Sequence, residues 1–141
     1  TTNSNLVMTD FVSTGSSYDN WVSPENIGVT STLNGAHIFS LADDAATSFT
    51  PPGNAGFVKF TAISGTRWVT AHFRTLTPEC TEMAAGANVE TTTGALSGTL
   101  DDSDGTNGNI IVSAHTDGKL YFGNRSGGAA TLHVYVEAAI Q

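Results

Sequence analysis

Short runs in which apolar and polar residues alternate recur along the whole chain. The clearest is residues 130–138, ATLHVYVEA, where Leu132, Val134 and Val136 occupy every second position. A period of two places successive side chains on opposite faces of a β-strand. We predict strands at residues 5–12, 27–33, 36–42, 56–63, 67–75, 88–93, 109–115, 118–123 and 130–138.

Turn-forming pairs separate these runs, among them Asn34-Gly35, Asp117-Gly118 and Gly127-Gly128. Many short strands with such turns between them predict an all-β domain, either a sandwich or a barrel. The segment 78–87, PECTEMAAGA, lacks the alternation, and we predict a helix of about two turns for it.

The second face of several predicted strands is unusual in composition. It carries aromatic rings, histidine and small polar groups where a solvated face would hold more Lys and Glu. Such faces are typical of protein–protein contacts, in which Trp and Tyr are enriched. The alternative is that these rings lie at the rim of the sandwich or beneath a loop. The interface candidates are Phe57, Trp68, His72, His133 and Tyr135.

Composition narrows the classes of function. The 141 residues suit one domain, 1–141, and 39% of them are apolar. A formal net charge of −8 argues against binding to nucleic acid or anionic lipid, because both need a basic face. No apolar run approaches the ~20 residues of a membrane span. The single cysteine, Cys80, excludes an intrachain disulfide and favours assembly in a reducing cytoplasm.

Residues 100–110, LDDSDGTNGNI, form the one candidate metal loop. Clustered carboxylates and amides on a glycine-rich loop are ligands that Ca²⁺ accepts, but their spacing matches no complete EF-hand set. The alternative is a solvated hairpin loop, and we expect no metal and no cofactor. The candidate calcium ligands are Asp101, Asp102, Asp104, Asn107 and Asn109.

Catalytic motifs are missing from the sequence. The four histidines fall singly on predicted strands, without the spacing of a zinc site. Cys80 has no basic neighbour in sequence, no Gly-x-Ser-x-Gly motif is present, and no two carboxylates are placed as an acid/base couple. We therefore expect a protein that is not an enzyme.

Two stretches carry a resemblance to known proteins. Residues 91–137 contain a Thr/Gly-rich lead-in, the turn Asp117-Gly118, the run LYFGNR and an alternating final strand. Together with residues 49–74, FTPPGNAGFVKFTAISGTRWVTAHFR, this segment resembles small jelly-roll proteins of tailed bacteriophages, of the TNF and C1q type. The resemblance implies an antiparallel β-sandwich of jelly-roll type with about eight or nine strands, and usually a homotrimer.

The resemblance also implies a role. Such modules serve as virion structural proteins, and we expect a capsid decoration or cement protein that binds the major capsid protein at the virion surface after assembly in the bacterial cytoplasm. A tail-fibre or spike tip is the second possibility. A secreted carbohydrate-binding module, with Trp21, Trp68 or Tyr121 as a stacking platform, and a donor-strand pilin subunit are further alternatives.

Residues 1–12 admit two interpretations. The polar start TTNSN is followed by the apolar alternation LVMTDFV. Such a segment can pair with a neighbour's sheet edge as an attachment arm, or it can be an edge strand of its own domain.

Overall fold

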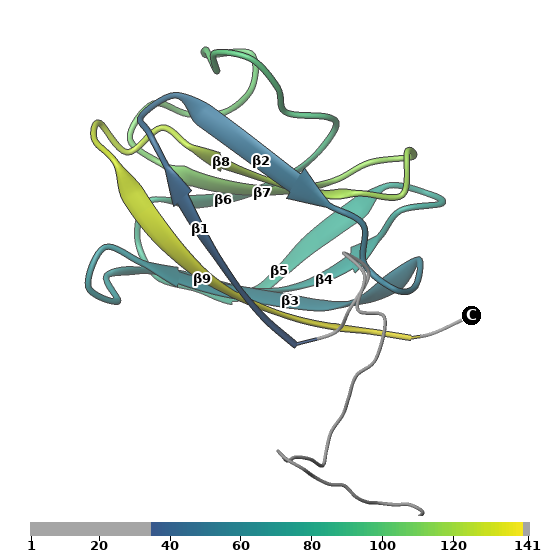
Figure 1. The fold of residues 1–141 in the computed structure, drawn as a ribbon. Coiled ribbons are helices and arrows are strands. Elements are labelled where there is room, and N and C mark those ends of the chain that lie inside the picture. Colours follow the sequence, from purple (N-terminus) through teal and green to yellow (C-terminus); the bar gives the residue numbers. More distant parts are fainter. Residues whose placement is uncertain (1–34, 140–141) are drawn as a thin grey trace, which may run out of the picture. The chain divides into compact units, whose positions relative to one another are not determined.

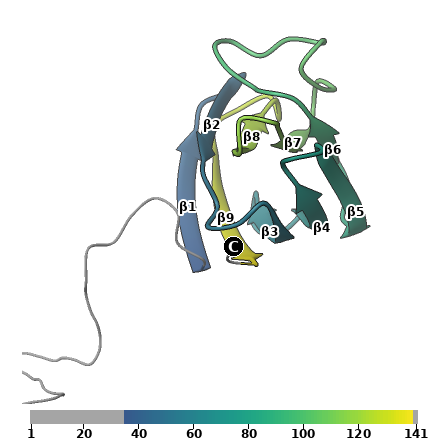
Figure 2. The same cartoon turned by 90° about the vertical axis from the view of Figure 1, so that its right-hand side faces the viewer.

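A computed structural model of the chain describes residues 35–139, which form nine β-strands in two sheets. Figures 1 and 2 show the two sheets facing each other. The five-stranded sheet has the order β1-β9-β3-β4-β5, and the four-stranded sheet has the order β2-β8-β7-β6. The strands are β1 (Gly35–Leu41), β2 (Ala45–Phe49), β3 (Ala55–Ala62), β4 (Arg67–Arg74), β5 (Glu79–Ala85), β6 (Val89–Thr93), β7 (Ile110–Ala114), β8 (Leu120–Asn124) and β9 (Ala130–Ala138).

The predicted all-β sandwich is confirmed. Seven of the described strands, all except β2 and β5, match a predicted range to within a few residues. The predicted strands 5–12 and 27–33, and the arm at residues 1–12, lie outside the described residues. No helix of residues 35–139 is long and apolar enough to cross a membrane.

The alternation seen in the sequence becomes the core of the sandwich. Every second residue of β9 is buried, and the residues between them are exposed. Apolar side chains from both sheets meet in one cluster, which removes them from water and supplies the main driving force for folding. Members of this core that are completely buried are Val58, Ala71, Phe73, Ile110, Val112, Ala114, Leu120, Phe122, Leu132 and Val136.

The connectivity agrees with a jelly roll in part. β1 pairs with β9 and β2 pairs with β8, so early and late strands of the described segment are neighbours in both sheets. The long connections of Greek keys produce this kind of pairing. However, β3, β4 and β5 are consecutive in one sheet, and β6 runs parallel to β7. The second sheet is therefore mixed rather than wholly antiparallel, and the jelly-roll type stays a prediction.

The predicted helix at 78–87 is wrong, because residues Glu79–Ala85 form strand β5. A helix of two turns is marginal without tertiary support. The outer edge of β4, by contrast, offers unpaired backbone groups to any segment that follows it closely. β5 pairs with that edge, with Cys80 opposite Phe73 and Glu82 opposite Ala71, and a bulge interrupts the register between Thr70 and Ala71.

Candidate functional site

The outer side of the four-stranded sheet is covered by the chain itself. The loop of residues 94–109 passes over β7 and β8, as the top of Figure 1 shows. Leu96 and Leu100 of this loop pack on Ile111 and Tyr121 in a second apolar cluster. All five residues of β7 and all five of β8 are consequently buried. This side of the sandwich has no open apolar surface at its centre.

The outer side of the five-stranded sheet has no such cover from residues 35–139, and we call it the open face. All five interface candidates lie on it, because strand register brings alternate residues of β1, β9, β3 and β4 to the same side. Residues of the open face are Ala36, Ile38 and Ser40 on β1, Thr131, His133, Tyr135 and Glu137 on β9, Phe57, Lys59 and Thr61 on β3, Trp68, Thr70, His72 and Arg74 on β4, and Glu79 and Thr81 on β5.

Large apolar side chains on the open face are well exposed. Ile38 is 66% exposed, Phe57 44%, Trp68 38% and Tyr135 47%. Scattered apolar residues are normal on a protein surface, but these four lie on adjacent strands of one sheet. A group of this kind marks a contact surface more often than single exposed residues do. Sequence reasoning missed Ile38, although it occupies an alternate position in the predicted strand 36–42.

Cross-strand pairs organise the rings and charges. Phe57 lies opposite His72, and their rings meet edge to face at a centroid distance of 5.5 Å. Lys59 lies opposite Tyr135, with Nζ 5.4 Å from the centroid of the phenol ring. Directly opposed side chains on one face of an antiparallel pair are close enough to interact in this way.

One ion pair lies at the β4–β5 end of the sheet. Arg74 Nε is 2.8 Å from Glu79 Oε1, and both side chains are substantially exposed. The hydroxyl of Thr81 donates to the Glu79 carboxylate, and this bond, together with Arg74, holds the pKa of Glu79 below its ordinary value. Such an exposed pair adds little to stability and serves mainly to orient its side chains.

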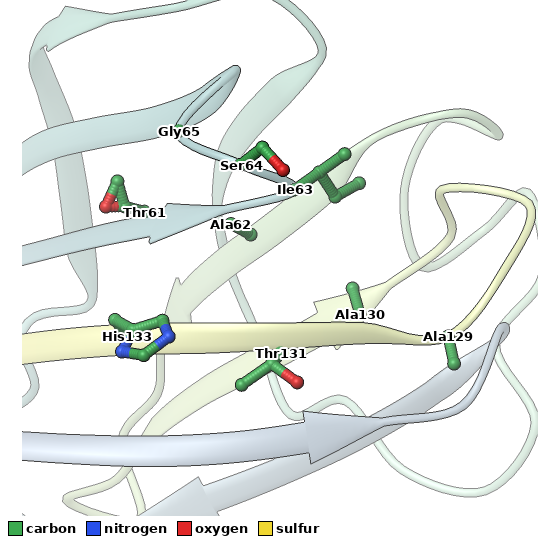
Figure 3. A pocket seen from close by; sticks show the side chains of 9 residues that line it. All are labelled: Thr61, Ala62, Ile63, Ser64, Gly65, Ala129, Ala130, Thr131 and His133. Atoms are coloured by element: carbon green, nitrogen blue, oxygen red, sulfur yellow. The ribbon is translucent and has the colours of Figure 1, made fainter.

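Two shallow hollows adjoin one another on the open face. One, of about 410 Å³, is lined by residues that include Lys59, Trp68, Thr70, His133 and Tyr135. The other, of about 530 Å³, lies between the β3–β4 turn and the start of β9, and Figure 3 shows its lining side chains. Thr61 and His133 line both hollows, so the two are neighbours that share part of their walls.

The position of Trp68 depends on a glycine. A Cβ atom built on Gly86 would lie 2.5 Å from Trp68 Nε1, so the indole rests directly over the Gly86 backbone. The Gly86 amide also donates to the Trp68 carbonyl at 2.9 Å. The Trp68 ring is therefore supported by Gly86 and remains 38% exposed.

Loop 101–109, the calcium candidate, uses its carboxylates within the protein. Asp101 accepts from the Ser103 amide and hydroxyl, which lowers the pKa of Asp101 below its ordinary value. Asp104 accepts from the Asp101 amide at 2.9 Å, and Asp102 accepts from Arg125 at 2.8 Å. Asn109 holds the loop through its backbone, since its carbonyl accepts from the Arg125 amide. Asn107 is exposed.

Sequence reasoning missed the two residues that fasten this end of the sandwich. Asn124 is completely buried, and its amide nitrogen donates to the carbonyls of Leu41, Ala42 and Gly128. The neighbouring Arg125 joins the β1–β2 turn to the covering loop, through Asp44 and Asp102. Both residues belong to the run LYFGNR, and this was the sequence signal that could have drawn attention to them. The chain has only five Lys and Arg residues, so an arginine close to an Asp-rich loop was informative.

Neither a metal centre nor a known family emerges. Among residues 35–139, no group of three or more His, Cys, Asp or Glu side chains is placed to hold a metal ion. The Cys80 thiol is largely buried, which raises its pKa to about 12 and keeps it protonated near neutral pH. No family model, curated protein or solved structure matches the chain.

Proposed function

We propose that the chain is a non-enzymatic structural protein that acts through its open face, and that its role is capsid decoration in a tailed bacteriophage. One observation carries the contact function: within residues 35–139, a loop covers the outer side of one sheet, whereas rings on the outer side of the other sheet are exposed. The viral role rests on the resemblance of residues 49–74 and 91–137 to small virion jelly rolls.

Self-association is the first contact that this face supports. Trp and Tyr side chains give large contact areas at low entropic cost, and exposed rings at the centre of a face are typical contact hot spots. The open face carries two cations, Lys59 and Arg74, and two carboxylates, Glu79 and Glu137, so it is close to neutral in a chain whose net charge is −8. Repulsion between copies is therefore weaker there than over the rest of the surface. We expect a homotrimer that also binds the major capsid protein.

The test compares two apolar substitutions. Trp68→Ala removes an exposed ring from the open face, whereas Leu76→Ala removes an exposed apolar side chain from the β4–β5 turn. In sedimentation velocity, Trp68→Ala should raise the dissociation constant of the trimer at least about tenfold, and Leu76→Ala should leave it unchanged. A wild-type chain that stays monomeric at micromolar concentration would contradict the self-association.

The virion role needs its own experiment. The position of the chain in an intact particle distinguishes decoration from host attachment. Many copies spread over the shell would support decoration, and a few copies at a tail tip would favour the alternative of an attachment module.

A second candidate is carbohydrate binding. The hollow of about 410 Å³ combines two aromatic side chains, Trp68 and Tyr135, with the donors Lys59, Thr70 and His133. Convergent polar groups around aromatic walls are typical of small-ligand sites. Titration of the protein with neutral and acidic oligosaccharides, followed by Trp fluorescence, tests it. Saturable binding that is lost in Trp68→Ala and kept in Leu76→Ala would favour this function.

A further inference from the structure

The β3–β4 turn holds a β-branched residue in an unusual backbone conformation. Ile63 has φ 53°, Ser64 has φ 55° and Gly65 has φ 79°. Left-handed backbone is ordinary for glycine, but it is a clear outlier for isoleucine. The turn is fixed by Thr66, whose amide and hydroxyl both donate to the Ile63 carbonyl at 3.1 and 2.7 Å.

The fold does not need isoleucine at this position. Asn or Gly would adopt the same backbone more readily, and the Ile63 side chain is 39% exposed. Backbone strain that the surrounding structure maintains tends to occur at binding sites. A strained turn that holds an apolar side chain at the surface therefore indicates that this side chain contacts another molecule.

Ile63 lies beside a hollow that can accept a side chain of its own kind. In Figure 3 the turn residues lie on one side of the 530 Å³ hollow and the start of β9 lies on the other. The β9 side is built from the small residues Ala129, Ala130 and Thr131, which leave room above the backbone. An apolar projection and a hollow with small walls are thus immediate neighbours.

Charge favours a second copy of this chain as the occupant. The lining of the hollow contains no Asp, Glu, Lys or Arg, although the chain as a whole carries −8. Two copies repel each other over most of their surfaces, and they approach at least cost where the acidic groups are absent. The hollow also shares Thr61 and His133 with the neighbouring hollow, which Trp68 and Tyr135 line.

A projection and a hollow that lie side by side can meet their own counterparts only close to a symmetry axis. We infer that the symmetry axis of the self-assembled protein passes beside the β3–β4 turn, so that Ile63 of one copy enters the hollow of another. This inference rests on the proposed self-association, and it adds where the axis lies and which residue anchors the contact.

Cross-linking tests the position of the axis. In a Cys80→Ala background, Ser64→Cys places one thiol in the turn, and Thr116→Cys places one in the exposed β7–β8 turn as a control. A short bis-maleimide should join Ser64→Cys chains into covalent dimers and leave Thr116→Cys chains uncross-linked. A trimer in which Ser64→Cys gives no covalent dimer would place the axis elsewhere and overturn the inference.

Substitution of the anchor gives an independent readout. Ile63→Asn keeps a residue that tolerates the left-handed backbone and removes the apolar side chain, so self-association should weaken at least about tenfold. Leu76→Asn makes the matched apolar-to-Asn change at an exposed residue of the β4–β5 turn, away from the hollow, and should leave self-association unchanged. Ile63→Leu restores an apolar side chain and should restore association, while circular dichroism verifies that every variant is folded.

The two proposals fail in different ways. If Trp68→Ala dissociates the protein and Ile63→Asn does not, the open face is the contact but Ile63 is not its anchor. If the wild-type protein is a monomer, the proposed self-association is wrong, and the inferred position of the symmetry axis is wrong as well.

Discussion

The guanidinium of Arg125 and the carboxylate of Asp102 lie 2.8 Å apart, although the arginine side chain is only 8% exposed and the aspartate side chain is 91% exposed. Arg125 Nη1 also donates to the Gly105 carbonyl, and its Nε donates to Asp44 Oδ1 at 3.0 Å. One buried cation therefore connects the β1–β2 turn with the loop that covers the four-stranded sheet.

The two sides of this pair should respond differently to substitution. Arg125→Met leaves the Gly105 carbonyl and Asp44 without their partner, and we expect a loss of about 3 kcal/mol in the free energy of unfolding. Asp102→Asn removes only the exposed partner and should cost less than about 1 kcal/mol. Urea denaturation of both variants measures the difference, and equal losses would contradict it.

Tyr121 should give the protein a distinct alkaline transition. Its hydroxyl donates to the Asp117 carboxylate, and this bond, with burial, raises the pKa of Tyr121 to about 12. A group whose pKa is raised by folding contributes fully below its unfolded value of about 10 and loses that contribution as pH rises through its folded value. Stability should therefore fall between about pH 10 and pH 12, and less so in Tyr121→Phe. Absorbance titration at alkaline pH should show one late tyrosine, which disappears in the variant.

The same hydrogen bond predicts a second pH dependence, in which the stability of the protein falls as the pH becomes acidic. Burial of Asp117 opposes ionisation, but the Tyr121 hydroxyl and the Lys119 amide donate to the carboxylate and hold its pKa below its ordinary value. This contribution is present above a pH of about 4 and is lost as pH falls through the folded pKa. Tyr121→Phe should reduce the loss of stability at acidic pH. Tyr135→Phe on the open face is the matched control, and it should leave the losses of stability at acidic and at alkaline pH as they are in the wild-type protein.

Gly123 and Leu100 should be coupled. A Cβ atom on Gly123 would lie 2.8 Å from Leu100 Cδ1, so Gly123→Ala forces the covering loop outward at a cost of about 1–3 kcal/mol. Leu100 is 2% exposed, and Leu100→Ala should cost about 2–5 kcal/mol through the cavity that it leaves. In the double variant the new methyl group enters that cavity. The combined loss should fall short of the sum by about 1 kcal/mol, and strict additivity would show that the two residues do not share this space.

Calcium should not stabilise the protein. The carboxylates of Asp101, Asp102 and Asp104 already accept hydrogen bonds from within the protein. The unfolding temperature should therefore be the same in millimolar Ca²⁺ and in EDTA. An ion that binds the folded protein, at a concentration far above its dissociation constant, would raise that temperature by several degrees. Such a rise would support a calcium site in this loop.

The sequence by itself determined the strand pattern and the two faces of the central strands. Alternation in residues 56–63, 67–75 and 130–138 correctly separated Val58, Phe73 and Leu132 from Phe57, Trp68 and Tyr135, because the β-strand period depends only on local backbone geometry. The same local rule placed all five interface candidates on outward-facing positions before the order of the strands was known.

Tertiary structure decided what local pattern could not express. Within residues 78–87, Glu79–Ala85 became an edge strand because β4 supplied unpaired backbone groups, and the weakly alternating β2 was defined by its pairing with β8. Which outer face stayed open depended on where the 94–109 loop came to rest, with Leu96 and Leu100 on Ile111 and Tyr121. Contacts between residues distant in sequence fix these features, and such contacts leave no periodic trace in any single segment of the chain.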